Sequence, residues 1–160
     1  MGVHGRDYMR DRSVFDDGAG DDRGTLGPPW ATRILVAALA ILWVVFAAAF
    51  DGGRPNELAR LIIDDLLLHP GTSIADGLLW QIVTCSAFHS PNGVGHVGWN
   101  LVLLFLFGRA VERHRGRSTL IAAAWTGALV WALVATTAAH VGLRTPELVF
   151  GATGMVLALA

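Results

Sequence analysis

The feature that most constrains the fold is the uniformly apolar run from Ile34 to Phe50, ILVAALAILWVVFAAAF. A helix in the core of a soluble protein normally keeps one polar face, and this run has none. With Trp30 and Arg33 at its start, the segment is long enough to cross a hydrocarbon core of about 30 Å. The sequence therefore predicts a transmembrane helix here.

The rest of the chain has the same preference for lipid, since 53% of its 160 residues are hydrophobic and only 16% are charged. A second helix is expected from His96 to Val111, and a third from Thr119 to Ala139, where Ala123 and Gly127 offer small residues for close helix contact. Phe150–Ala160 begins a fourth apolar segment, and eleven residues cannot span a bilayer. We predict an all-α, polytopic transmembrane helix bundle that is truncated in its fourth helix.

The chain divides into a tail and a membrane domain. Residues 1–29 mix arginines and aspartates with glycines, contain no apolar run and close with Pro28-Pro29, which is typical of a disordered tail. This stretch is too long and too acidic for the basic start of a secretory signal. Residues 30–160 are expected to form a partial membrane domain.

The long segment between the first two predicted spans is mixed in character. It opens with the turn-forming sequence Asp51–Pro55, and the leucines, isoleucines and charges of Asn56–Leu68 predict an amphipathic helix at the interface. The apolar patch Leu78–Phe88 is too short to span, so we expect it to pack at membrane level. Cys85 is the single cysteine, and we interpret it as a packed thiol. No histidine spacing around it suggests a metal site.

The arginines predict the orientation. Nine of the twelve lie in two places, the tail with the entry to the first span (Arg6, Arg10, Arg12, Arg23, Arg33) and the turn after the second span (Arg109, Arg113, Arg115, Arg117). The positive-inside rule places both in the cytoplasm, and it places the first loop and the loop Val141–Val149 outside. We interpret Glu112, beside Arg113 and Arg115, as part of a solvated interfacial ion cluster.

Two groups of residues have the chemistry of a site. His96 and Asn100 are four residues apart, so they share a helix face, and together they can donate hydrogen bonds to an oxyanion. The alternative is that they only join neighbouring helices. Gly151-Ala152-Thr153-Gly154 places the Thr153 hydroxyl and free backbone N–H groups at a helix start, where a nucleophile could lie. The alternative is that these small residues only allow close packing.

Read in order, several short motifs resemble the rhomboid family of intramembrane serine proteases, over about Ile34 to the end of the chain. The motifs are a leucine-rich loop ending in His69-Pro70, Trp80-Gln81-Ile82-Val83-Thr84 (family Trp-Arg-x-x-Thr), Ala87-Phe88-His89, His96-x-x-x-Asn100, Phe107-Gly108-Arg109-Ala110-Val111-Glu112 (family Phe-Gly-x-x-x-Glu), and Gly151-Ala152-Thr153-Gly154 (family Gly-x-Ser-Gly). Each motif is short, and the order and spacing of the set make it specific.

The resemblance implies roles for individual residues. In the family, a serine at the start of the fourth helix attacks a peptide bond of a transmembrane substrate, and a histidine of the sixth helix takes its proton. The resemblance puts Thr153 in the nucleophile position, between the motif glycines Gly151 and Gly154. It gives His96 and Asn100, together with the backbone N–H of Thr153, the oxyanion-hole role.

Three departures bear on activity. Thr153 replaces serine, and its added methyl group crowds the attack. The chain given ends before the helix that carries the family's general base. His89 and His96 are two residues further apart than is usual, which leaves the role of His89 open; His140 is a less favoured candidate for a replacement base.

Two functions follow from the resemblance. The first is a rhomboid serine endopeptidase that hydrolyses peptide bonds of transmembrane substrates and is inactive as the given chain. The alternative is a pseudoprotease that binds transmembrane segments without cutting them. For either one we expect an integral protein of a bacterial plasma membrane with lipids and transmembrane proteins as partners, and no nucleic acid, cofactor or metal. A transporter or channel half is disfavoured, because no acidic residue is expected within the membrane to couple an ion.

Overall fold

The computed structural model describes residues 28–143 and 151–160, so residues 1–27 of the predicted tail and residues 144–149 of the loop Val141–Val149 lie outside the described residues. Three of the described helices are long and apolar enough to cross a membrane: α1 (Trp30–Ala48), α4 (Val94–Arg115) and α5 (Arg117–His140). A short helix α6 (Thr153–Leu159) begins the fourth segment. These helices confirm the predicted all-α membrane bundle, and each of the three spans begins before the residue predicted for it.

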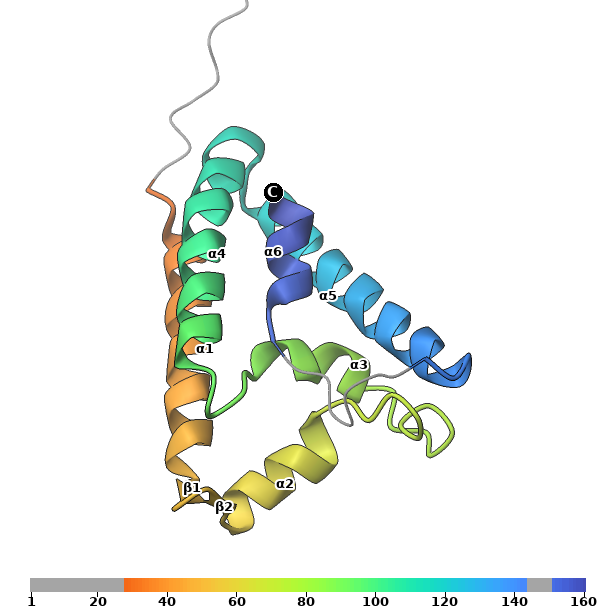
Figure 1. Ribbon diagram of the computed structural model, residues 1–160. Coiled ribbons are helices and arrows are strands. Elements are labelled where there is room, and N and C mark those ends of the chain that lie inside the picture. Colours follow the sequence, from red (N-terminus) through yellow and green to blue (C-terminus); the bar gives the residue numbers. More distant parts are fainter. Residues whose placement is uncertain (1–27, 144–150) are drawn as a thin grey trace, which may run out of the picture.

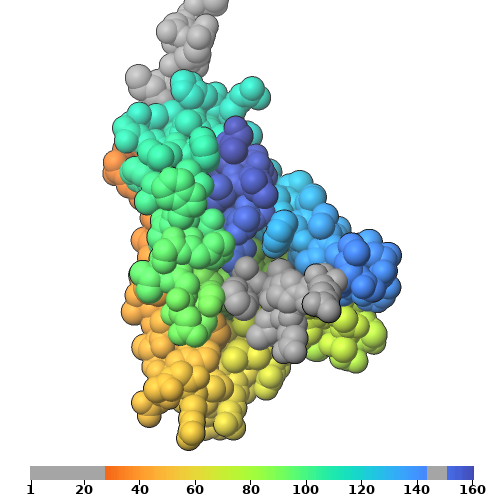
Figure 2. All heavy atoms as spheres, in the orientation of Figure 1, coloured from red at the N-terminus to blue at the C-terminus, as the bar shows by residue number. Residues whose placement is uncertain are grey.

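The helices form an open bundle (Figure 1). The chains of α1 and α4 run side by side in opposite directions, and Gly116 turns the chain directly from α4 into α5 with a positive φ of 88°. In Figure 2, α6 lies between α4 and α5. Leu39 of α1, Leu104 of α4, Leu120 of α5 and Met155 of α6 meet in one buried apolar cluster. The start of α6 is therefore held by helices from both sides.

The first loop contains the predicted turn and the predicted amphipathic helix. Strands β1 (Phe50–Asp51) and β2 (Arg54–Pro55) pair around two glycines with positive φ, which is the conformation that glycine allows in a tight hairpin. Helix α2 (Glu57–Leu66) follows, and the Asn56 side chain caps it by accepting from the Ala59 N–H at 3.0 Å.

The short apolar patch folds into helix α3 (Gln81–Thr84) and the 3₁₀ turn η3 (Cys85–Ala87). The buried Gln81 side chain donates to the Asp64 carbonyl at 2.7 Å and accepts from the Ser73 hydroxyl, and the Ser73 oxygen accepts from the His69 N–H at 2.8 Å. These bonds tie α3 to the end of α2, and the Cys85 carbonyl accepts from the Gly151 N–H at 3.2 Å. The first loop therefore supports the turn that precedes α6.

Helices α5 and α6 touch backbone to backbone. A Cβ added at Gly127 would collide with the Gly154 carbonyl oxygen, and a Cβ added at Gly154 would collide with that of Gly127. The close helix contact predicted at Gly127 is confirmed. Its predicted companion Ala123 is only partly buried, and Ala124 and Ala128 are the fully buried alanines of this part of α5.

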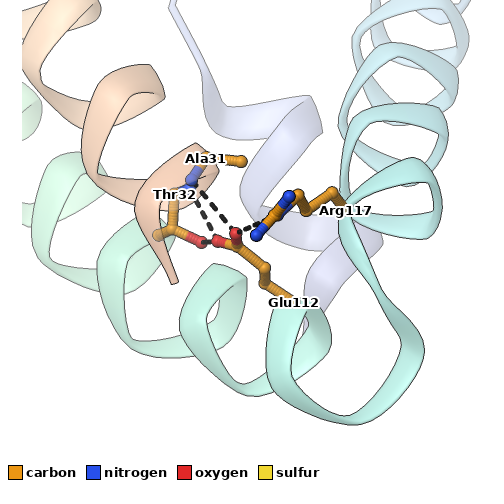
Figure 3. A network of polar contacts seen from close by, with 4 residues as sticks. All are labelled: Ala31, Thr32, Glu112 and Arg117. Carbon is orange, nitrogen blue, oxygen red and sulfur yellow. Dashed lines mark hydrogen bonds and ion pairs between the residues drawn. The ribbon is translucent and has the colours of Figure 1, made fainter. Parts of the chain in front are cut away.

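The prediction that Glu112 is solvated is wrong, because Glu112 is only 2% exposed. Its carboxylate accepts from the Ala31 N–H at 3.0 Å, from the Thr32 N–H at 2.8 Å and from the Thr32 hydroxyl at 2.7 Å (Figure 3). The first N–H groups of a helix lack intrahelical acceptors and attract negative charge, so Glu112 caps α1 from the neighbouring helix. Gly108, one turn earlier, leaves room for this approach, since a Cβ there would lie 3.0 Å from the Thr32 methyl carbon.

Candidate functional site

The start of α6 meets the second turn of α4 at the residues that the sequence singled out. The buried Asn100 side chain donates from Nδ2 to the Thr153 hydroxyl oxygen at 3.3 Å. Thr153 is the first residue of α6 and is partly buried. The predicted proximity of Asn100 and Thr153 is confirmed, and their chemical role stays a prediction.

His96 lies at the mouth of this site. Its Nε2 atom is 3.2 Å from Asn100 Nδ2 and accepts from it, because an amide nitrogen can only donate. The Nε2 edge of the ring faces Asn100, as the predicted common helix face requires, whereas the residue as a whole is exposed. His96 lies in the first turn of α4, and its neighbours Val94 and Gly95 are also exposed.

His89 is a site residue whose role the sequence left open. It is fully buried, and its Nε2 accepts from the Ala152 N–H at 3.1 Å, directly before Thr153, while Asn100 Nδ2 lies 3.5 Å away. Burial and then the nearby His96 lower the pKa of His89 to about 4, so its ring is neutral. Since Nε2 accepts, the proton is on Nδ1, which has no hydrogen-bond partner among the described residues. The sequence signal was a lone histidine directly after the apolar pair Ala87-Phe88.

Gly151 allows the chain to turn between the two histidine rings. Its φ of 108° is a conformation that other residues rarely adopt, and a Cβ there would lie 3.5 Å from both His89 Cδ2 and His96 Nε2. Its N–H donates to the carbonyl of Cys85. The Cys85 thiol is buried, and burial raises its pKa to about 11, so the interpretation as a packed thiol is confirmed.

The described side chains around Thr153 donate a hydrogen bond to its hydroxyl oxygen, and none of them accepts the hydroxyl proton. Asn100 Nδ2 carries two hydrogens, which its contacts with Thr153 and His96 occupy. An amide that donates to a hydroxyl oxygen occupies a lone pair and leaves the hydroxyl proton in place. Among residues 28–143 and 151–160, no imidazole or carboxylate accepts from Thr153, and His140 instead has its Nδ1 3.0 Å from the Thr136 carbonyl of its own helix.

In the part of the chain that the structure describes, no three histidine, cysteine, aspartate or glutamate side chains gather as metal ligands. The site is therefore built from amide, imidazole and hydroxyl groups.

One comparison with known proteins gives a match. The family model of the Rhomboid domain matches residues 76–160, which is more than half of the chain and includes His89, His96, Asn100 and Thr153. No curated protein and no solved structure matches the chain.

Proposed function

This chain belongs to the rhomboid family, and from that premise we propose that Asn100, His96 and Thr153 form the carbonyl-binding half of an intramembrane peptidase site. The ligand is a peptide segment of a transmembrane protein. The observation that carries the proposal is the hydrogen bond of 3.3 Å from the buried Asn100 amide of α4 to the Thr153 hydroxyl of α6. This bond brings an amide donor next to a hydroxyl oxygen that could act as a nucleophile, although 53 residues separate the two in sequence.

Each group has a distinct part in the proposed chemistry. Attack of the Thr153 oxygen on a peptide carbonyl carbon would form a C–O bond, open the C=O double bond and place negative charge on the carbonyl oxygen. The hydroxyl proton would have to pass to a base, which none of the described residues supplies. The Thr153 N–H, which as the first of α6 has no intrahelical partner, would then donate to the carbonyl oxygen. The Asn100 amide would donate to it as well, by turning one N–H away from the Thr153 oxygen while His96 Nε2 accepts the other. One oxyanion-hole donor is typically worth about 10²- to 10³-fold in kcat. His89 holds the Ala152 N–H and thereby positions the turn.

The same geometry supports binding without cleavage by the described residues. None of them takes the Thr153 proton, and general-base assistance typically contributes about 10²- to 10⁴-fold. Threonine also has a stiffer χ1 than serine, which restricts the attack. We therefore propose that the 160-residue chain binds a peptide carbonyl and leaves the bond intact.

The second candidate function is hydrolysis with Thr153 as the nucleophile, and the position of its hydroxyl at the donors favours it. The two candidates are separated by a transmembrane reporter reconstituted with the chain in lipid vesicles. We expect no cleavage by the chain or by Thr153→Ser, because none of the described residues acts as a base at the hydroxyl. Cleavage that disappears in Thr153→Ala would contradict the binding proposal and establish the peptidase.

Binding itself is measured by crosslinking from a photoreactive residue in the reporter. We expect Asn100→Leu to reduce crosslinking near the start of α6, because it removes the buried donor. The matched control is Asn92→Leu, the same change at an exposed loop position. Equal crosslinking by the two variants would remove the carbonyl-binding role.

We also propose that the N-terminus and the turn at Gly116 face the cytoplasm, because nine of twelve arginines gather there. Single cysteines placed at Arg115 and at Gly53 should be labelled from opposite sides of the membrane. Both residues are exposed; Arg115 ends α4 and Gly53 lies between β1 and β2, and the end of α4 and the two strands lie at opposite ends of the bundle (Figure 1). Labelling from the same side would reject this orientation.

A further inference from the structure

An apolar groove of about 290 Å³ runs between α1 and α5 at the end of the bundle where α4 turns into α5. Its walls include Trp30, Ile34 and Ala38 of α1 and Ile121 and Trp125 of α5, and Met155 of α6 also lines it. The four large wall side chains are between 43% and 59% exposed. The groove therefore opens on the outer surface of helices that cross the membrane, where lipid is the surrounding solvent.

A cation stands at one end of this groove. Arg117 precedes Ile121 by one helical turn, so both lie on the same face of α5. The guanidinium carbon of Arg117 lies 4.5 Å from the centre of the Trp30 ring, and its side chain is 47% exposed. Its ionic partner among the described residues is Glu112, 3.6 Å from Nε (Figure 3). The outer edge of the guanidinium therefore stays open to a second anion.

The described residues around the groove carry a net positive charge. The described residues at this end include five arginines and a single acidic residue, Glu112. The arginines are Arg33, Arg109, Arg113, Arg115 and Arg117. Glu112 already accepts three hydrogen bonds from the start of α1, so its negative charge mainly stabilises the N-terminus of that helix. It therefore neutralises Arg117 only in part.

We propose that the groove binds one acyl chain of an anionic phospholipid, with the lipid phosphate held by Arg117. From Arg117 to Trp125 the helix advances about 12 Å, at about 1.5 Å per residue. This length is close to half of a hydrocarbon core of about 30 Å, so the groove extends from headgroup level nearly to the middle of the bilayer. Trp30, which stacks on Arg117, is the residue type that prefers the headgroup level.

The charges also argue against a second copy of the chain in this groove. A symmetric dimer would bring the same surface patch of each protomer together, and each patch carries Arg117 with further arginines nearby. Like charges would then face each other, whereas an anionic lipid supplies the opposite charge. Anionic lipids attract basic residues near the membrane surface, and each arginine raises the affinity roughly fivefold.

The test is native mass spectrometry of the full chain in detergent, with phosphatidylglycerol or phosphatidylcholine added at equal concentration. We expect one phosphatidylglycerol to be retained in preference to phosphatidylcholine, and Arg117→Gln to reduce that retention roughly fivefold. Arg115→Gln is the matched control, because Arg115 is an exposed arginine of the same end that does not line the groove. Equal retention of the two lipids by the unchanged chain would overturn the proposal.

A second variant covers the case in which Arg117→Gln disturbs the fold through Glu112. Ala38→Phe places a ring in the groove at an exposed position and leaves all charges unchanged. We expect it to abolish selective retention of phosphatidylglycerol while the circular dichroism of the chain stays the same. Unchanged retention would show that the lipid binds elsewhere. A dimer that dissociates on Ala38→Phe would assign the groove to a second copy and also overturn the proposal.

Discussion

Replacing Glu112 by glutamine is the sharpest test of the cap that joins α4 to α1. The carboxylate accepts three hydrogen bonds at 2.7 to 3.0 Å, and a hydrogen bond to a charged group is worth about 1.5–3 kcal/mol. Glutamine keeps one carbonyl oxygen and turns the other acceptor into an N–H₂ group that faces donors. At least one bond is lost, so we expect Glu112→Gln to lower the free energy of unfolding by about 2–3 kcal/mol. Glu112→Ala removes every acceptor and should cost about 3–5 kcal/mol.

The measurement is a titration with sodium dodecyl sulfate in mixed micelles, followed by the fluorescence of the six tryptophans. Glu57→Gln is the matched control, because Glu57 lies exposed in the first turn of α2 and should cost less than about 1 kcal/mol. A double-mutant cycle with Thr32→Val should give a coupling energy of about 1 kcal/mol or more. Equal losses for Glu112→Gln and Glu57→Gln would refute the cap.

Three further predictions concern the site and its support. Gly127→Ala should destabilise the chain by about 1–3 kcal/mol, because the new methyl group meets a carbonyl oxygen of α6, whereas Gly98→Ala, with open space around it, should be neutral or stabilising in the same titration. The pKa of His89 is about 4 in the folded chain and ordinarily 6.5, so the unfolded chain takes up the proton first as the pH falls. The contribution of neutral His89 to the free energy of unfolding is therefore complete above pH 6.5 and is lost as the pH falls toward 4. That part of the pH dependence of unfolding should disappear in His89→Gln and persist in His114→Gln, at an exposed histidine. Cys85, whose pKa burial raises to about 11, should react with maleimide at pH 7 only after the chain is unfolded.

The spans were predictable because a bilayer demands long apolar runs, and such runs are visible in the sequence alone. The spacing of four between His96 and Asn100 likewise fixed their common face on α4. The partner of a buried polar group is harder to predict, because periodicity gives the face of a helix and not what lies opposite. Glu112 is surrounded by arginines in the sequence, which led to the prediction that its side chain is solvated. Its carboxylate oxygens instead accept hydrogen bonds from the first turn of α1, about 80 residues away. His89 reaches Ala152 across 63 residues through a loop that no periodicity describes.

The contact between Gly127 and Gly154 has a consequence for how the site tolerates its surroundings. Because two main chains meet there, no side-chain atom fits between the two glycines, although an apolar groove of about 350 Å³ opens beside them. The start of α6, which carries the Thr153 hydroxyl, is therefore joined to α5 by main-chain atoms that no neighbouring side chain separates. Saturation mutagenesis of α5 should accordingly find that every substitution of Gly127 destabilises the chain, while outward-facing neighbours such as Val130 and Leu133 accept almost any apolar residue.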